Sequence, residues 1–328
     1  MSHELLILTA DDIAGLLDPE AVHASQRRAF EALGSGAAEL APKVVVPGAE
    51  DSSLLTYTAR SAREAAGVVK VIGFQPANPT RGLDPVQGAV LVLDPLTGQP
   101  VALMDGPALT TPRTAAGSAV ATELLARADA RVLTVVGTGV QARAHLAALS
   151  RVRAFEAVHV VGRRAEAAEE LAAWARETLG LAAQAGTDLT AVAGESDVVV
   201  TCTTSSEPLV DASMVRDGAL VISVGSFAPD RSELATDLLG RAALVVVDDV
   251  ATATAQAGCV IDAVDAGAVS AEALVPLGAV ATGAHPGRGS EEDVVVYNSV
   301  GIAVQDATIA EELLALARER GAGTRIPF

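Results

Sequence analysis

The chain has 328 residues, half of them hydrophobic, and a formal net charge of −18. This length supports a large core and more than one compact domain, and no low-complexity tract indicates disorder. Because so acidic a chain repels polyanions, we expect neither nucleic acid nor an anionic membrane among its partners.

The N-terminal third is predicted to form a mixed α+β module. Its first residues are acidic and amphipathic, and they do not resemble a signal peptide. We therefore expect a cytoplasmic protein. Apolar residues spaced by three and four predict a helix over residues 11–36. Short β-rich runs follow between residues 43 and 105, with a hairpin turn at 94–100.

A second helix is predicted over residues 111–128, capped by Thr111 and with Pro112 in its first turn. Strands and helices then alternate to the end of the chain, which is typical of a doubly wound parallel sheet. We therefore predict an α/β fold in which a Rossmann domain spans 126–302 and a mixed α+β domain comprises 1–125 and 303–328. Apolar strands are predicted at 131–137, 156–162, 196–203, 218–225 and 242–249, and helices at 164–180 and 306–320.

The segment GTGVQA (137–142) joins the first of these strands to a helix and matches the pattern G-x-G-x-x-A. The first glycine permits a tight turn, the second lets a pyrophosphate approach the backbone, and the alanine lets helix and strand pack closely. A helix N-terminus also attracts a phosphate. The predicted dinucleotide contacts in this turn are Gly137, Thr138, Gly139, Val140 and Gln141.

The second strand of the Rossmann pattern sets the choice of cofactor. It ends in Gly162, Arg163 and Arg164, without the Asp or Glu that usually binds the ribose 2′-hydroxyl of NAD. Arginine suits a 2′-phosphate, so the sequence predicts a preference for NADP(H), with NAD(H) possible and Arg163 favoured over Arg164. The alternative is that both arginines only begin a solvated helix.

The first domain carries the motifs LAPKVVVP (40–47), VVKVIGFQPANP (68–79) and LTTPRTAAGSA (109–119). Together with the glycine turn, VGSFAPDRSEL (224–234) and VYNSVGIAVQDA (296–307), they occur in an order that resembles the ornithine cyclodeaminase/μ-crystallin family over nearly the whole chain. The resemblance implies a small α-amino or α-imino acid bound between the domains. It also implies a homodimer formed through the sheet of the first domain, so 1–125 with 303–328 is the expected substrate-binding and dimerisation domain.

The resemblance assigns the substrate carboxylate to Lys43, Lys70 and Arg113, and the catalytic roles to Lys70 and Arg113. A guanidinium matches a carboxylate in geometry, and ammonium groups add positive charge. Strand-edge solvation of the lysines and an acidic partner for the arginine are the structural alternatives. Tyr57 and Phe227 stand where ornithine-cyclising relatives carry Glu and Asp, so both substrate-contact positions point away from ornithine.

Further cofactor contacts follow from the fold and the resemblance, because the carboxyl ends of parallel strands face the dinucleotide. Ordinary strand-end structure is the alternative for each. Asp306 matches an acid frequent in the family, and a capping role for the last helix explains it equally well. The predicted contacts are Thr203, Thr204, Val224, Gly225, Ser299 and Gly301.

These features predict an NAD(P)H-dependent reductase of a cyclic ketimine carboxylate, Δ1-pyrroline-2-carboxylate or Δ1-piperideine-2-carboxylate, giving L-proline or L-pipecolate. The alternatives are ornithine cyclodeamination, an alanine-dehydrogenase type of oxidoreductase, and a protein that only binds a small ligand or nucleotide. Metal binding is not expected, because the five histidines are scattered. Cys202 and Cys259 are far apart and suggest no disulfide.

Overall fold

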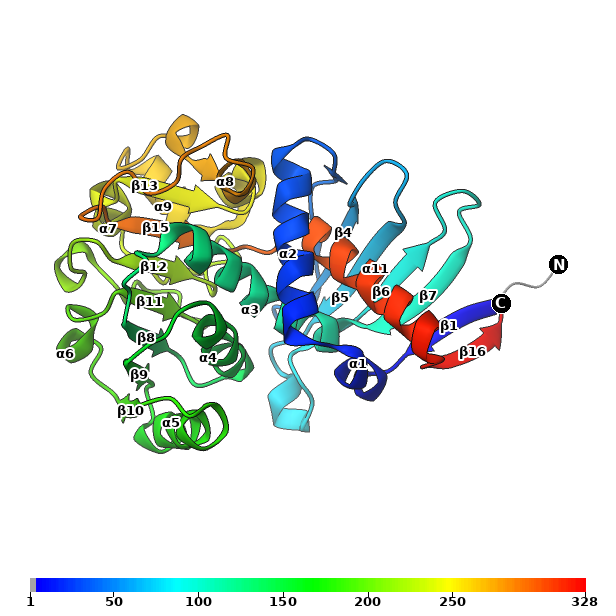
Figure 1. Cartoon of the computed structure of the whole chain (residues 1–328), viewed down its shortest axis with the longest axis horizontal. Helices are drawn as coiled ribbons and strands as arrows, with labels where there is room; N and C mark the ends of the chain where they lie inside the picture. The colour runs from blue at the N-terminus through cyan, green and yellow to red at the C-terminus, as the bar shows by residue number, and fades with distance from the viewer. Residues whose placement is uncertain (1–3) are drawn as a thin grey trace. The chain divides into compact units, whose positions relative to one another are not determined.

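The computed structural model describes residues 4–328, which form two compact units (Figure 1). Unit 1 runs to Arg113 and resumes at Ile302–Phe328, and unit 2 is Thr114–Gly301. The first boundary was expected at residues 125/126 and instead falls inside one continuous helix, α3 (Gly106–Leu125). A sequence pattern marks where a helix ends, but not where its packing partners change. Residues 1–3, which the domain prediction included, lie outside the described residues.

Unit 1 is built on an eight-stranded sheet with the order β16-β1-β7-β6-β5-β4-β2, in which β3 also pairs with β4. All pairs are antiparallel except β1 with β7. The turn predicted at 94–100 joins β6 to β7, where Asp94 Oδ1 accepts from Thr97 N at 2.8 Å. The strands are β1 (Glu4–Leu8), β2 (Glu39–Leu40), β3 (Val44–Pro47), β4 (Ser53–Arg60), β5 (Gly67–Phe74), β6 (Val86–Leu93), β7 (Pro100–Asp105) and β16 (Thr324–Pro327).

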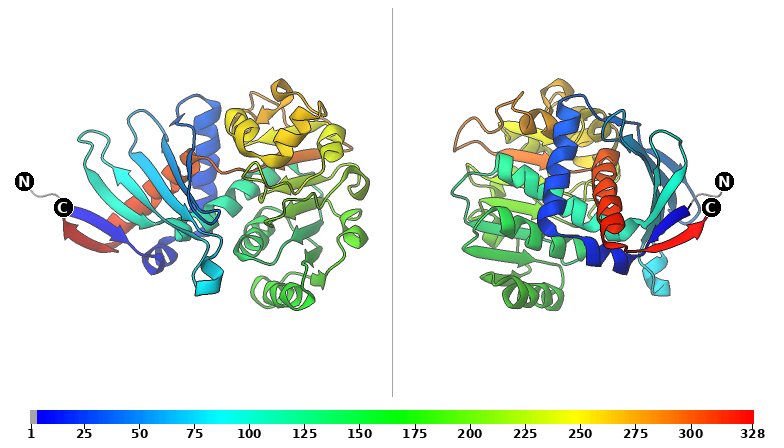
Figure 2. Two further views of the ribbon diagram at one scale, coloured as in Figure 1. Left: turned by 180° about the vertical axis from the view of Figure 1, so that it is seen from behind. Right: turned by 45° about the vertical axis from the view of Figure 1, so that its right-hand side comes forward.

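Two helices of unit 1, α2 (Pro19–Gly34) and α11 (Ala303–Arg320), lie side by side over one face of this sheet (Figure 2). The single helix predicted over 11–36 is two helices, because Asp18 caps α2 with Pro19 at its first position, and α1 (Ala10–Leu16) ends before it.

The helix predicted over 111–128 begins five residues earlier than expected, at Gly106. The cap is not Thr111 but Asp105, whose Oδ1 accepts from Ala108 N at 2.8 Å. Pro112 is therefore inside α3 rather than in its first turn. The glycine and proline of 106–107 hid this start from the sequence pattern.

Unit 2 contains a second eight-stranded sheet, entirely parallel, with the order β10-β9-β8-β11-β12-β15-β13-β14. The strand order reverses between β8 and β11, which is where open α/β sheets bind ligands. The predicted α/β class with a Rossmann sheet is confirmed, and three strands, β10, β14 and β15, were not predicted. The strands are β8 (Val132–Val136), β9 (Ala157–Val161), β10 (Ala183–Gly186), β11 (Val198–Thr201), β12 (Leu220–Ser223), β13 (Leu244–Val247), β14 (Val275–Pro276) and β15 (Val295–Asn298).

Helices connect the parallel strands of unit 2. The first two are α4 (Val140–Val152), which follows β8, and α5 (Ala165–Leu179), which follows β9. A core of buried valine, leucine and alanine side chains fills the sheet faces. Within residues 4–328, no helix is long and apolar enough to cross a membrane. The remaining helices are α6 (Thr190–Ala193), α7 (Thr236–Arg241), α8 (Val250–Gln256), α9 (Gly258–Asp265) and α10 (Leu277–Ala281).

Candidate active site

Lys70 lies inside unit 1, on the face of β5 that packs against α11. Its side chain is 1% exposed, and its Nζ lies 2.7 Å from Oδ2 of Asp306, which is equally buried. Arg113 binds the same carboxylate from α3, where its Nε donates to Asp306 Oδ1 at 3.0 Å. One buried carboxylate therefore joins two of the cations that the sequence analysis assigned to substrate.

Tyr57 stands directly opposite Lys70 in the antiparallel pair of β4 and β5. The Lys70 ammonium lies 4.4 Å from the centre of the Tyr57 ring. The ammonium of Lys43, the residue before β3, lies 5.6 Å from the same ring centre. Because the face of an aromatic ring attracts cations, the Tyr57 ring stabilises both ammonium groups beside it. The structure thus brings together four predicted substrate contacts, Lys43, Tyr57, Lys70 and Arg113, as a cation cluster.

Burial alters the ionisation of this cation cluster. It lowers the pKa of Lys70 to about 8, an effect that Asp306 opposes and that Arg113 and Lys43 reinforce. Burial likewise lowers the pKa of Lys43 to about 8 and raises the pKa of Tyr57 to about 12. At neutral pH the cluster holds three cations, of which Lys70 and Arg113 share one carboxylate, so the cluster is locally positive within a chain of net charge −18.

Asp306 is a member of this site that the sequence analysis did not assign. It lies in the first turn of α11, and its carboxylate binds Lys70 and Arg113. The start of α11 is instead held by Gln305, whose Oε1 accepts from Ile302 N and from Arg113 Nη1, both at 3.1 Å. The available signal was an acid inside the apolar run AVQDATIA, because a buried acid needs a cationic partner.

The glycine turn joins β8 to α4, as predicted. Gly137 has a φ of 119°, and a Cβ there would lie 2.6 Å from the carbonyl oxygen of Cys202, so the position requires glycine. A Cβ on Gly139 would meet no described heavy atom within 4 Å. Among residues 4–328, no side chain caps the N-terminus of α4. The open approach to Gly139 and the free helix start together fit a pyrophosphate group.

The two arginines that are predicted to select the cofactor directly follow β9. Arg163 and Arg164 are both exposed, and Arg164 is the N-cap residue of α5. Gly162, before them, is closely packed, since a Cβ there would lie 2.5 Å from the methyl group of Thr138. The glycine turn and the arginines therefore lie beside each other at the carboxyl edge of the sheet, as a site for the ribose phosphate requires.

A buried carboxylate that the sequence analysis did not single out lies at the ends of β11 and β12. Glu233 Oε1 accepts from both the N and the Oγ1 of Thr203 at 2.7 Å. Its Oε2 accepts from Gly225 N at 2.6 Å. Thr204 is exposed and Val224 is buried. The donors of Thr203 and Gly225 thus serve Glu233, which agrees with the strand-end alternative for these two positions.

The other two predicted cofactor contacts at strand ends are also held by a buried acid. Asp248, which follows β13, accepts from Gly301 N at 2.7 Å and from Ser299 Oγ at 3.3 Å through its Oδ2. The hydroxyl of Tyr297, in β15, donates to Asp248 Oδ1. The described contacts of Ser299 and Gly301 are therefore structural ones.

Phe227 is the predicted substrate contact that belongs to unit 2. It is half-buried, and the Arg231 guanidinium carbon lies 5.0 Å from the centre of its ring. It lies two residues beyond Gly225, on the loop that Glu233 closes. A neutral ring at this position supplies no proton-transfer group.

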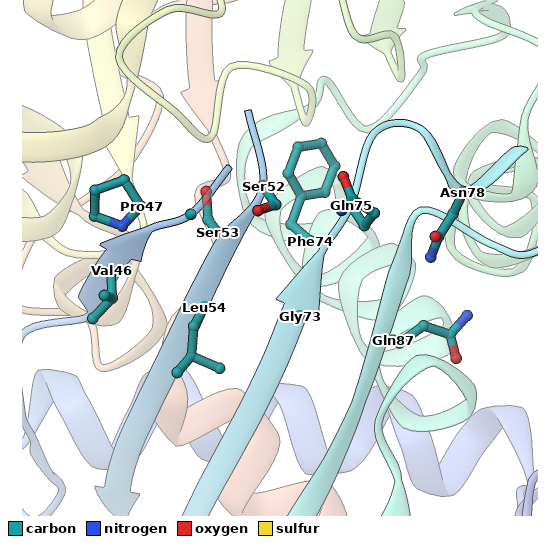
Figure 3. Close-up of a pocket in the computed structure, with 11 residues that line it drawn as sticks. Val46, Pro47, Ser52, Ser53, Leu54, Gly73, Phe74, Gln75, Asn78 and Gln87 are labelled. Carbon is teal, nitrogen blue, oxygen red and sulfur yellow. The ribbon is translucent and has the colours of Figure 1, made fainter. Parts of the chain in front are cut away.

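A separate pocket of about 390 Å³ lies in unit 1, at the ends of β3 to β6 (Figure 3). Leu54, Gly73 and Gln87 line it, and all three lie on the sheet face opposite to Lys70 and Tyr57. It therefore does not include the cation cluster. The residues lining it are otherwise short or uncharged: Val46, Pro47, Gly48, Ser52, Ser53, Phe74, Gln75 and Asn78.

The chain resembles known proteins over almost its entire length. It is 35% identical over 280 residues to a Delta(1)-pyrroline-2-carboxylate reductase of Bacillus cereus (strain ZK / E33L), covering 85% of this chain and 86% of the relative. The solved Delta(1)-pyrroline-2-carboxylate reductase of Thermococcus litoralis, in complex with NADH and L-proline, superimposes with a TM-score of 0.94 at 30% identity, covering 98% of this chain and 100% of that one. An archaeal alanine dehydrogenase dimer with bound NAD superimposes with a TM-score of 0.92 at 30% identity, covering 99% and 100% of the two chains.

The family comparison agrees with these individual similarities and with the sequence motifs. Residues 3–320 match a single family across both units, from the first strand to the last helix. The chain belongs to the ornithine cyclodeaminase/mu-crystallin family.

Proposed function

We propose that the chain is an NAD(P)H-dependent reductase of cyclic ketimine carboxylates, converting Δ1-pyrroline-2-carboxylate or Δ1-piperideine-2-carboxylate to L-proline or L-pipecolate. The observation that carries this proposal is the cation cluster: Lys70 and Arg113 bind one buried carboxylate, and Lys43 lies over the same Tyr57 ring as Lys70, in a strongly acidic chain. A local surplus of positive charge suits an anionic substrate. The similarity to pyrroline-2-carboxylate reductases supports the same substrate class.

Arg113 and Lys43 hold the substrate carboxylate. The guanidinium of Arg113 has five N–H groups, and its described partners Asp306 and Gln305 accept from two of its nitrogens, Nε and Nη1. Asp306 fixes the Lys70 and Arg113 head groups, so less conformational entropy is lost when substrate binds. Lys70 lies beside the imine nitrogen of the substrate. Because the pKa of Lys70 is about 8, its ammonium group can donate a proton to that nitrogen, or hydrogen-bond to it, at neutral pH.

The glycine turn and the start of α4 hold the pyrophosphate of the dinucleotide, and Arg163 holds the 2′-phosphate of NADPH. The bound nicotinamide supplies the hydride that reduces the C=N carbon. The task of the cations is then to hold the carboxylate in one orientation, because reduction of the adjacent carbon depends on alignment. Tyr57 and Phe227 offer no carboxylate to a second ammonium group, which disfavours ornithine as substrate.

The test is a panel of substrates with the purified protein. NADPH and NADH oxidation are followed with pyrroline-2-carboxylate, piperideine-2-carboxylate, and pyruvate plus ammonia, with ornithine plus NAD⁺ as the opposing control. We expect the highest kcat/KM with a cyclic ketimine. Ammonia release from ornithine without imine reduction would reject the proposal.

Reduction of an open-chain imine is the second candidate. It is favoured by the full-length similarity to an alanine dehydrogenase with bound NAD. Both candidates use the same carboxylate-binding cations and differ in whether the substrate carbon and nitrogen are joined in a ring. The pyruvate plus ammonia arm of the panel separates them.

The cofactor preference is tested at Arg163. The Arg163→Ala variant should lose roughly tenfold in kcat/KM with NADPH and change little with NADH, because only NADPH carries the 2′-phosphate. Arg164→Ala is the matched control, as the neighbouring exposed arginine at the N-cap of α5. An unchanged ratio of NADPH to NADH efficiency in Arg163→Ala would remove the assignment.

The active form is a homodimer that buries the outer face of the unit 1 sheet. Strand pairing places Val44, Val46, Leu54 and Val71 on the face opposite to Lys70, where all four are exposed. Contiguous exposed apolar side chains mark an interaction surface. The structural similarity to an alanine dehydrogenase described as a dimer supports the same assembly.

A further inference from the structure

Glu233 is buried, and its carboxylate accepts hydrogen bonds from two adjacent strand ends. Thr201 Oγ1 and Ser223 Oγ, the last residues of β11 and β12, donate to Oε2 at 2.7 and 2.9 Å. Thr203 and Gly225, in the loops that follow, donate to Oε1 and Oε2. Both carboxylate oxygens are thus occupied by donors that are themselves uncharged.

The backbone of Glu233 is fixed as firmly as its side chain. Its N donates to Ser226 Oγ at 2.9 Å, and its carbonyl oxygen accepts from Leu209 N at 2.8 Å. Gly225 shows how closely the loop is wrapped around the carboxylate, because a Cβ there would lie 2.6 Å from its Cδ and 2.1 Å from the carbonyl oxygen of Thr203. Loop 224–233 is therefore closed on itself around one carboxylate.

The location of this network links it to the cofactor. β11 is the first strand beyond the reversal of strand order, and its following residue, Cys202, lies against the glycine turn at Gly137. Ligands of open parallel sheets bind beyond these carboxyl ends. A carboxylate is an unexpected group so close to a site for an anionic dinucleotide, since its charge opposes binding. A structural benefit must outweigh that repulsion.

We propose that Glu233 is a positioning residue for the dinucleotide: it holds the loops after β11 and β12 in the shape that receives the nicotinamide half. The proposal rests on the proposed function in one respect, that unit 2 binds a nicotinamide dinucleotide. Glu233 acts through Thr203 and Gly225, without touching the cofactor. Removing the Glu233 carboxylate weakens cofactor binding because the two loops no longer keep their shape. The loss of its negative charge alone would strengthen cofactor binding.

The Glu233→Gln variant tests this proposal because it keeps the shape of the side chain. An amide replaces one accepting oxygen by an NH₂ group, which then faces the backbone N–H of either Thr203 or Gly225, a donor that cannot accept, whichever way it is turned. We expect the Kd of NADH, measured by fluorescence titration without imine, to rise about tenfold or more. The KM of the imine at saturating NADH should change less than about twofold.

Asp197→Asn is the matched control. Asp197 also joins two strands of the unit 2 sheet, but at their amino ends, where its Oδ2 accepts from Arg131 N and Val132 N at 2.7 and 3.0 Å. This variant should lower the Tm as Glu233→Gln does, and leave the Kd of NADH unchanged. If Glu233→Gln also lowers the Tm but binds NADH as the wild type does or more tightly, Glu233 has no positioning role.

Two further measurements keep the proposal decidable. If Glu233→Gln does not fold, Ser223→Ala removes one donor and leaves the carboxylate, and it should raise the Kd of NADH about threefold; an unchanged Kd rejects the proposal. A wild-type protein that binds NADH but reduces no imine overturns the proposed function while the titrations still decide the role of Glu233. A wild type that binds neither NADH nor NADPH overturns both.

Discussion

Lys70 and Arg113 illustrate how a single carboxylate makes a buried cationic site possible. Taking two cations out of water is costly unless a partner lies nearby, and Asp306 supplies that partner at 2.7 and 3.0 Å. One carboxylate only partly compensates three cations, which leaves the cluster able to attract an anion. Burial is the main cause of the lowered pKa values of Lys70 and Lys43, and in Lys70 the neighbouring cations Arg113 and Lys43 lower the pKa further.

These pKa values predict how substrate affinity depends on pH. Because the pKa values of Lys70 and Lys43 are about 8, both ammonium groups lose their protons as the pH rises through 8, and the affinity for a carboxylate falls. Pyrrole-2-carboxylate, a planar analogue without an imine nitrogen to titrate, isolates this effect. Its inhibition constant should rise roughly tenfold between pH 7 and 9.5.

Lys43→Arg supplies the control, because a guanidinium keeps its charge over this range and part of the rise should disappear. A constant inhibition constant across the range in the wild type would mean that neither lysine holds the carboxylate.

The sequence predicted all four residues of the cation cluster, but it did not assign the carboxylate that binds two of them. Lys43, Tyr57, Lys70 and Arg113 could be found because their motifs match a family. Asp306 could not be assigned, since an acid at a helix start is equally well explained as a cap. Only the packing of α11 against β5 distinguishes the two roles.

At the scale of the elements, the glycine turn depends on two glycines with different physical roles. Gly137 has a positive φ and no room for a Cβ, whereas Gly139 has a negative φ and open space above it. The first glycine serves the fold, and the second leaves room for the dinucleotide that we propose to approach the backbone.

The two positions therefore predict opposite phenotypes. Gly137→Ala should lower stability by about 1–3 kcal/mol, because it combines a strained φ with a clash against Cys202. Gly139→Ala should keep the wild-type Tm and raise the KM of the dinucleotide roughly tenfold, because its methyl group occupies the path of the pyrophosphate. Thermal denaturation and cofactor kinetics on the pair check both statements. A destabilised Gly139→Ala with normal cofactor KM would contradict the distinction.

Element boundaries were less predictable than element types, for physical reasons. The alternation of unit 2 followed from apolar strands buried on both faces, which a sequence displays directly. The start of α3 depends on Asp105 capping a helix that opens with glycine and proline, and β10 is a short strand without an apolar run. Glu233 was missed because nothing local distinguishes a carboxylate that gathers donors from 30 residues upstream.

For the whole molecule, the two faces of the unit 1 sheet differ in how they are covered. One face carries the cation cluster and packs against α11. The other carries Val46, Leu54 and Val71, which are 51%, 47% and 40% exposed. Burying such a surface contributes about 25 cal/mol per Å², so a second copy of the chain would be stabilised by covering it. The net charge of −18 opposes association, and the interface must therefore be largely apolar.

Val71→Glu should convert the dimer to a monomer. Val71 lies in the middle of β5 and its side chain is 40% exposed, so a charge there is tolerated in the separated chain but is buried without a partner in the dimer. Molar mass from light scattering should fall to half of the wild-type value, with the Tm of the variant measured alongside. Leu96→Glu is the control, because Leu96 is 93% exposed in the β6–β7 turn and should leave the mass unchanged. A dimeric Val71→Glu, or a monomeric wild type, would show that this face is not the interface.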